Sequence, residues 1–282
     1  MEIMLDCIPC MLRQVLEASR LATDNADLQK NIMEDAIRIA SHYKDFKNSP
    51  DLCHAMHQTI KRYAHIEDPY AKIKSRDIEA AKKIYPDLID FLKRKQNSLY
   101  WALKISATGN IIDSAINNNA NMMGCVRKDL EKDFSHCDLE DFEGKLETDK
   151  SILIIGDNAG ETVFDRVLAE RLSQYNLTFA VRSEPVINDA TAEDAYASGL
   201  ADFANIVSTG CGAPGAVLDD CNKKFLNIFQ SADVIISKGQ GNFEALSECS
   251  RPVFFLLKAK CPVIAKKLGV CLNDYVFQFK PV

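Results

Sequence analysis

The second half of the chain is a series of short apolar runs separated by helical patterns, and this alternation restricts the fold more than any other feature. Residues Ile152–Ile155 form the first run, and Thr162–Leu172 after it has the spacing of an amphipathic helix. Further runs are Thr178–Val181, Ile206–Val207, Val234–Ile236, Val253–Leu257 and Tyr275–Phe279. Strands roughly 25 residues apart with helices between them are typical of right-handed βαβ units. We therefore predict an α/β fold with a Rossmann-like, mostly parallel sheet over residues 149–282.

The first half of the chain has a different rhythm. Apolar residues recur there at intervals of three and four, as at Met11–Leu12 and Val15–Leu16, which is the spacing of one helix face. No convincing strand pattern interrupts them. We predict an all-helical domain over residues 1–148 that precedes the sheet domain.

Composition excludes several classes of protein. The formal net charge is -6 and both signs are mixed along the chain, which argues against a nucleic-acid partner. No apolar run approaches the roughly 20 residues of a membrane span, and Asp6 interrupts any signal-peptide pattern. The ten cysteines are expected to be reduced thiols in a cytoplasmic protein without a membrane partner. Cys7 and Cys10 form the one CxxC pair, and we interpret them as small buried apolar residues in preference to an auxiliary metal or redox role.

Parallel sheets bind their ligands beyond the carboxyl ends of the strands, so the residues after each apolar run are the candidates for a site. In chain order these are Asp157 and Asn158; Arg182, Asn188 and Asp189; Lys238, Gly239, Gly241 and Asn242; and Lys258.

The pair Asp157-Asn158 supplies two hard oxygen donors, which suit Mg²⁺ or Mn²⁺. A structural alternative is a capping box, in which Asn158 and Glu161 organise a helix start, but that alternative gives Asp157 no task. Asp189 would add a second carboxylate, and a divalent cation would relieve the repulsion between the two acids. Two unrelated helix caps remain the other interpretation, with Thr191 as the cap of a helix at Ala192–Ala197.

The segment Lys238-Gly-Gln-Gly-Asn242 brings a cation and two glycines to a helix start, where backbone N–H groups approach anions closely. Arg182 is a further candidate for binding an oxyanion. This segment is not a Walker A loop, because its lysine precedes the glycines. No GxGxxG follows the first apolar run, which argues against a dinucleotide or similar adenosyl cofactor. A divalent metal, a lysine and a glycine-rich turn together favour phosphoryl chemistry.

Five motifs in this order resemble those of the damage-control phosphatases, also known as domain of unknown function 89. They are CIPC at 7–10, GNIID at 109–113, GDNAGE at 156–161, NDAT at 188–191 and KGQGNFE at 238–244. The resemblance covers essentially the whole chain. It implies a helical domain packed on a Rossmann-like domain, with the site between them. It also implies a divalent-metal-dependent phosphatase acting on small phosphorylated metabolites, such as sugar phosphates or damaged phosphorylated cofactors.

The resemblance further implies roles for single residues. The metal ligands fall on Asp157, Asn158 and Asp189, and the metal would be Mn²⁺, Co²⁺, Ni²⁺ or Mg²⁺. Lys238 corresponds to the phosphate-contacting lysine, Lys258 has a supporting role, and Asn110 and Asp113 approach from the helical domain. The nucleophile is either a metal-polarised water or the Asp157 carboxylate. A carboxyl methyltransferase and a non-catalytic binder of phosphorylated metabolites remain alternative functions.

Overall fold

A computed structural model describes residues 1–111, 122–147 and 149–282. Its helices are α1 (Cys7–Ala22), α2 (Ala26–Ser41), α3 (Ser49–Ala64), α4 (Ala71–Lys93), α5 (Ser98–Thr108), α7 (Met122–Leu130), α8 (Leu139–Glu143), α9 (Thr162–Leu172), α10 (Ala192–Ala197), α11 (Lys223–Ser231), α12 (Gly239–Leu246) and α13 (Pro262–Leu268). Its strands are β1 (Phe134–Cys137), β2 (Ser151–Ile155), β3 (Asn176–Val181), β4 (Asn205–Ser208), β5 (Val234–Lys238), β6 (Val253–Lys258) and β7 (Tyr275–Lys280). None of the helices within these ranges is long and apolar enough to cross a bilayer.

The strands form one seven-stranded sheet in the order β1-β7-β6-β5-β2-β3-β4. All neighbours pair in parallel except β6 and β7, which are antiparallel. The predicted α/β fold with a mostly parallel sheet is therefore confirmed, and the six predicted runs are β2 to β7. The chain runs outward from β2 through β3 to β4 and then returns to β5 on the other side of β2. Open α/β sheets bind ligands at such a switch point.

The expectation that residues 1–148 contain no strand is wrong. Phe134–Cys137 form β1, which pairs in parallel with β7 at the edge of the sheet. Of its four residues only Phe134 is buried. The strand therefore depends on its hydrogen-bonded neighbour and carries no apolar run that the sequence could reveal.

Both faces of the sheet are covered by helices, because successive side chains of a strand point to opposite sides. Ile152 and Ile154 of β2 belong to a core shared with α4, α5 and α9. Leu153 and Ile155 belong to a second core with α11, α12 and α13. The first of these cores crosses residue 148, since α4 and α5 come from the first half of the chain. The division into domains at that residue stays a prediction.

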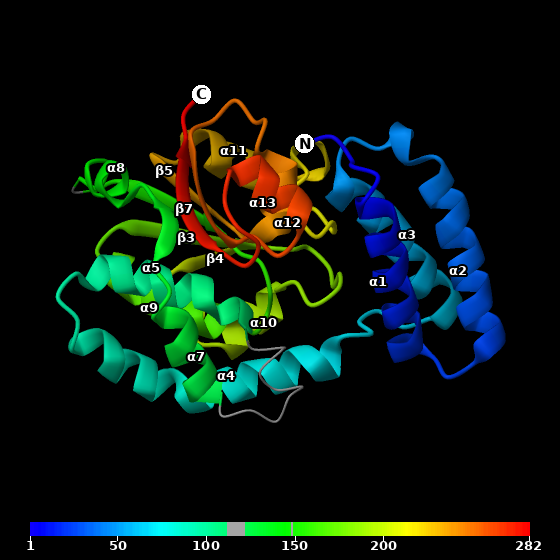
Figure 1. Ribbon diagram of the computed structural model, residues 1–282, viewed down its shortest axis with the longest axis horizontal. Helices are drawn as coiled ribbons and strands as arrows, with labels where there is room; N and C mark the ends of the chain where they lie inside the picture. The colour runs from blue at the N-terminus through cyan, green and yellow to red at the C-terminus, as the bar shows by residue number, and fades with distance from the viewer. Residues whose placement is uncertain (112–121, 148) are drawn as a thin grey trace.

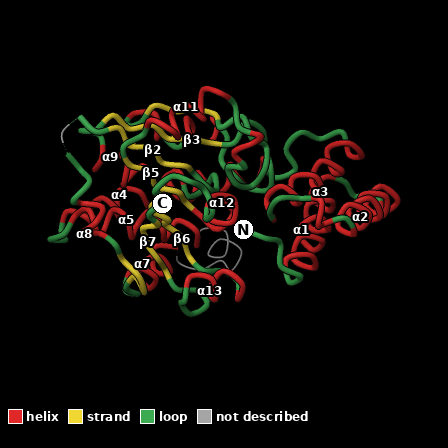
Figure 2. The backbone as a smooth tube through the Cα atoms, turned by 90° about the horizontal axis from the view of Figure 1, so that it is seen from above, coloured by secondary structure: helices red, strands yellow, loops and turns green. Residues whose placement is uncertain are grey.

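Helices α1, α2 and α3 form a separate group with its own core around Val15, Ile32 and Leu52, which we call the helical lobe. Both views set the lobe apart from the strands (Figure 1, Figure 2). Asparagine caps begin two of its helices. Asn25 accepts a hydrogen bond from Asp27 N at 2.9 Å, and Asn48 accepts one from Asp51 N at 3.1 Å. Such caps stabilise a helix by about 1 kcal/mol each.

The helical lobe docks on the α/β part through polar contacts. Lys61 Nζ lies 2.9 Å from Glu184 Oε2, and the Met1 ammonium donates to Glu244 O at 2.9 Å. Between the helical lobe and helices α12 and α13 the two parts are separated by a cleft.

Lys104 of α5 is an unusual core residue because its side chain is fully buried. Its Nζ lies 3.9 Å from the ring centroid of Tyr275 and 4.6 Å from that of Phe134. It has no hydrogen-bond partner among the described residues. Burial lowers the pKa of Lys104 to about 8, although the nearby Asp129 acts in the opposite direction.

We expect Lys104 to make the stability of the protein rise with pH. Between about 8 and the ordinary lysine pKa of 10.5, the unfolded chain binds a proton that the folded chain does not, so the free energy of unfolding increases as pH rises. Urea unfolding at about pH 7 and about pH 9.5 should show this increase for the wild type relative to Lys104→Met. The exposed-site variant Lys30→Met should behave like the wild type. An unchanged difference between the wild type and Lys104→Met at the two pH values would show that Lys104 stays charged in the folded state.

Candidate metal and phosphate site

Asp157 stands at the switch point of the sheet, directly after β2 and beside the start of α12. Gly239 follows β5 with a φ of +79°, and a Cβ on it would lie 2.0 Å from Asp157 Oδ2. Only glycine combines this backbone conformation with so close an approach. The glycine after Lys238 therefore brings the backbone of α12 against the carboxylate.

Backbone hydrogen bonds join the loop after β2 to the loop after β3. Ala159 N donates to Asn188 O at 2.8 Å, and Ala190 N donates to Asp157 O at 2.8 Å. Asn158 and Asp189 form an isolated antiparallel bridge between these bonds. The three predicted metal ligands are thus brought to one place by main-chain pairing.

The two carboxylates of this place are buried, with Asp157 8% and Asp189 4% exposed. Burial raises the pKa of Asp157 well above its usual range, and the charges of Glu161 and Asp189 add to the increase. Burial also raises the pKa of Asp189, although Arg182 opposes it. Within the described ranges Asp157 forms no ion pair. Of the two buried acids, Asp189 is therefore paired with Arg182, and Asp157 is the one without an ion-pair partner among the described residues.

Arg182 forms a buried ion pair with Asp189. Its Nε donates to Asp189 Oδ2 at 2.7 Å, and its side chain is 1% exposed. Neither Nη atom has a partner among the described residues. The observed contact orients a predicted metal ligand, and Arg182 does not line the cleft described below.

The structural alternative of a capping box at Asn158 and Glu161 is wrong. Helix α9 begins at Thr162, with Glu161 in the cap position and no side-chain cap. Asn158 Nδ2 instead donates to Glu161 Oε1 at 2.7 Å. The amide oxygen Oδ1 accepts no hydrogen bond from the described residues, so it remains a candidate ligand atom.

The residues fit a hard divalent cation with an incomplete protein ligand set. Within the described part of the chain, no three His, Cys, Asp or Glu side chains are arranged to hold a metal. The candidate ligands are two carboxylates and one amide, which are the donors that Mg²⁺ and Mn²⁺ prefer. Mg²⁺ commonly keeps several waters or substrate oxygens in addition to one or two carboxylates.

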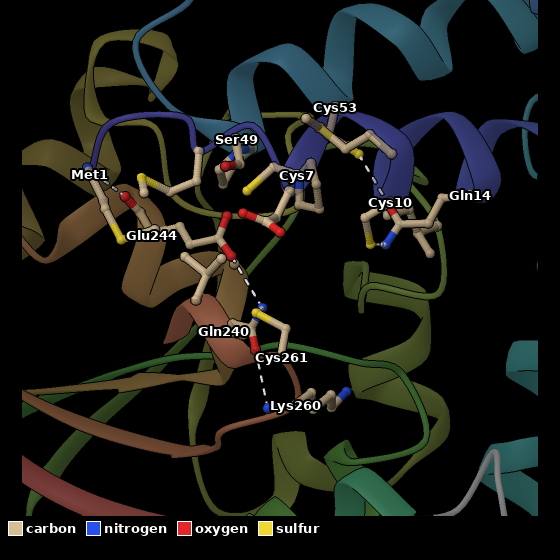
Figure 3. A pocket seen from close by; sticks show the side chains of 18 of the residues that line it. Met1, Cys7, Cys10, Gln14, Ser49, Cys53, Gln240, Glu244, Lys260 and Cys261 are labelled. Atoms are coloured by element: carbon tan, nitrogen blue, oxygen red, sulfur yellow. Dashed lines mark hydrogen bonds between the residues drawn. The ribbon is translucent and has the colours of Figure 1, made fainter. Parts of the chain in front are cut away.

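These ligands lie on the wall of a cleft of about 1150 Å³ between the helical lobe and helices α12 and α13. Asp157, Asn158, Asn188 and Asp189 line it, and Cys7 and Cys10 of α1 also line it, as do Cys53, Lys260 and Cys261. The close view shows the thiols, Glu244 and Lys260 around this space (Figure 3). Cys7 and Cys10 are partly exposed, so their interpretation as buried residues is wrong.

Lys238 does not reach the cleft. Its side chain is fully buried, and its Nζ donates to Ser106 O at 3.0 Å, to Glu161 Oε2 at 3.1 Å and to Asp165 Oδ1. Burial tends to lower the pKa of Lys238, but the two carboxylates outweigh this and raise it. An ammonium has three N–H donors, and all three are used inside the protein.

Asn242 and Gly241 hold the backbone beneath the cleft. Asn242 Nδ2 donates to Gly156 O at 2.8 Å and its Oδ1 accepts from Ala216 N at 2.9 Å. A Cβ on Gly241 would lie 1.9 Å from Pro214 O. Asn242 is fully buried, so it fixes the turn after β2, whereas Gly241 also lines the cleft.

Three predicted site residues remain: Asn110, Lys258 and Asp113. Asn110 Nδ2 donates to Glu161 Oε1 at 2.5 Å, and Lys258 Nζ donates to Asp129 Oδ2 at 3.0 Å. Neither residue lines the cleft. Asp113 lies outside the described residues.

Lys260 is the lysine that sequence reasoning passed over in favour of Lys258. It is exposed, lines the cleft and has no ion-pair partner within the described ranges. Its charge acts to lower the pKa of both Asp157 and Asp189, which places it near the acid pair.

Lys258 and Lys260 follow the same apolar run, and the turn at Ala259 decides which one faces the cleft. Ala259 fixes that turn through bonds with Asp274 O and Asn273 N of 2.9 and 2.8 Å.

The protein is a doubly wound α/β protein with a cluster of acidic residues at the switch point of its sheet. Comparison with known proteins then identifies the family: residues 3–276 match the damage-control phosphatase ARMT1-like domain, and the chain belongs to this family. It is 32% identical over 277 residues to the damage-control phosphatase PH1575 of Pyrococcus horikoshii, covering 96% of this chain and 95% of that protein. It is 29% identical to a damage-control phosphatase of Archaeoglobus fulgidus, with 96% of each chain covered.

A solved structure supports the same assignment. The crystal structure of the duf89 family protein ph1575 from Pyrococcus horikoshii matches with a TM-score of 0.88 and 30% sequence identity, over 99% of each chain. The relationship therefore covers the helical lobe as well as the sheet.

Replacement of Lys238 should destabilise the fold because it would leave Glu161 and Asp165 buried without their cation. We expect Lys238→Met to lower the free energy of unfolding by about 3–5 kcal/mol, as found when one partner of a buried ion pair is removed. The matched variant Lys260→Met, at an exposed position, should change it by less than about 0.5 kcal/mol. Guanidinium unfolding measures both. Equal stability of the two variants would refute the buried network.

Proposed function

We propose that the protein is a divalent-metal-dependent phosphatase that hydrolyses phosphomonoesters of small phosphorylated metabolites, such as sugar phosphates or damaged phosphorylated cofactors. The observation that carries the proposal is the pair of buried carboxylates of Asp157 and Asp189, which lines a cleft together with the partly exposed Asn158 and with Lys260. The names of the two relatives described as damage-control phosphatases support the same activity. The ten cysteines suit a reducing cytoplasm, where such metabolites occur.

Asp157, Asn158 and Asp189 would hold the ion, for which Mn²⁺, Co²⁺, Ni²⁺ and Mg²⁺ are the candidates. When bound, such an ion neutralises charge on a phosphate oxygen and so stabilises the transition state of phosphoryl transfer. Arg182 keeps Asp189 oriented through its Nε, and the main-chain bonds between the two loops keep the ligands in register.

Lys260 is the residue to which we assign the phosphate contact, in place of Lys238. Its side chain lines the cleft and forms no ion pair with any described residue, whereas the ammonium of Lys238 uses all three of its N–H donors. Asn188 and Gly241, which line the same cleft, are the further candidates for holding the substrate. The attacking group is either the Asp157 carboxylate or a water that the site polarises.

The alternatives differ in what they require. A carboxyl methyltransferase needs an adenosine site, and the turn after β2 reads Gly156-Asp157-Asn158 without the glycine-rich pattern of such sites. A non-catalytic binder would use the same residues as the phosphatase. Turnover therefore separates it from the enzyme.

Phosphate release from p-nitrophenyl phosphate and a panel of sugar phosphates should require one of the four divalent metals and disappear with a chelator. Asp157→Asn should lower the rate at least about 100-fold because a ligand and a charged group at the reacting centre are lost. Its stability in chelator should be equal to or higher than that of the wild type, since asparagine has no charge to bury. Lys260→Met should raise KM about 10-fold, while Lys266→Met, in the same cleft, should change it little.

Absence of phosphate release under every metal, with tight binding of the sugar phosphates, would favour the non-catalytic binder. Full activity of Asp157→Asn would refute the site. Full activity of Lys260→Met with loss of activity in Lys266→Met would move the phosphate contact to α13.

A further inference from the structure

The sequence Cys7-Ile-Pro-Cys10 forms the first turn of α1, and the proposed phosphatase activity gives it no task. Both thiols are partly exposed and line the cleft. We infer that Cys7 and Cys10 are a dithiol modification site that a small-molecule disulfide oxidises to an intrahelical disulfide.

The spacing of the two cysteines suits this reaction. Residues three apart on a helix have Cβ atoms about 5–6 Å from each other. A disulfide needs them about 3.5–4.5 Å apart. Closure therefore requires a movement of only about 1–2 Å, the difference between these two separations.

The first turn of α1 is the part of the helix that can make such a movement. Cys7 N donates to Met4 O at 2.9 Å and Ile8 N donates to Leu5 O at 3.2 Å, both in a turn that precedes the helical ladder. Pro9 has no N–H, and Asp6 makes no side-chain cap. Few hydrogen bonds therefore resist a shift of Cys7 toward Cys10.

Burial separates Cys53 from this pair, and position in the chain separates Cys261, which is partly exposed as well. Cys53 is 4% exposed, and its Sγ donates to Gln14 Oε1 at 3.8 Å. Cys261 accepts a hydrogen bond from Gln240 Nε2 at 3.3 Å and is the residue before α13, outside the helical lobe. A reagent in the cleft meets Cys7 and Cys10 on the same helix turn (Figure 3).

The chemistry proceeds in two exchanges. The Cys10 thiolate attacks one sulfur of the disulfide reagent, forms a mixed disulfide and releases the first thiol. Cys7 then attacks Cys10 Sγ, forms the Cys7–Cys10 bond and releases the second thiol. Two S–H bonds break and one S–S bond forms, and the two electrons and two protons pass to the reagent. Burial raises the pKa of Cys7 and so lowers its thiolate fraction, which leaves Cys10 as the thiol that attacks the reagent first; the second step is favoured because Cys10 is already adjacent.

Peptide mass spectrometry tests the inference directly, because trypsin places both cysteines in one peptide, Met1–Arg13. The full-length reduced protein is equilibrated with mixtures of oxidised and reduced glutathione, alkylated and digested. We expect this peptide to lose about 2 Da and to take up no alkylating reagent as the mixture becomes oxidising. Cys53→Ala should behave like the wild type. Cys7→Ser should instead leave Cys10 as a mixed disulfide with glutathione.

Three outcomes would overturn the inference. One is full alkylation of Met1–Arg13 in every mixture. Another is a mixed disulfide that persists on Cys10 of the wild type. The third is a cross-link from Met1–Arg13 to Asn48–Lys61, which contains Cys53, or to Cys261–Lys266. None of these measurements uses phosphatase activity, so the result is independent of the proposed function.

Discussion

The contact between the Asp157 carboxylate and the backbone of Gly239 is the constraint on which the rest of the site depends. β2 and β5 are neighbours in the sheet although they lie far apart in the chain, and their carboxyl ends define the switch point. A side chain at residue 239 would occupy the space of the carboxylate. The glycine thus allows an acid to sit at the centre of the sheet edge, where main-chain bonds then bring Asp189 beside it.

The acidic residues of the site fall into two groups, which differ in whether their charge is balanced within the protein. The lower layer lies beneath the cleft around Glu161, and the upper layer is the cleft wall at Asp157. In the lower layer Glu161 accepts hydrogen bonds from Asn110, Asn158 and Lys238, so its charge is satisfied within the protein. In the upper layer Asp157 has no cation among the described residues, and the pKa of its buried carboxyl is raised. A buried charge without a partner is costly. The cost is consistent with a site whose missing charge comes from a bound ion.

The sheet and the clustering of Asp157, Asn158 and Asp189 could be predicted because both depend on local patterns, whereas metal binding by these residues stays a prediction. Apolar runs located β2 to β7, and the rule that ligands bind at strand ends selected Asp157 and Asp189. Lys238 and β1 show where local patterns fail. Lys238 is the last residue of β5, but the direction of its side chain depends on Glu161 and Asp165, and no sequence spacing places these two acids beneath β5. Phe134–Cys137 becomes a strand through pairing with β7, and the turn at Ala259 selects Lys260 over Lys258.

Calorimetric titration of the chelator-treated protein with Mn²⁺ tests the central claim most directly, because it measures ion binding without reference to any substrate. The structure predicts about one ion per chain for the wild type and no measurable binding for Asp157→Asn or Asp189→Asn. Glu244→Gln removes another buried carboxylate of the same cleft and should leave binding unchanged. Undiminished binding in both aspartate variants, or its loss in Glu244→Gln, would contradict the assignment of the metal site.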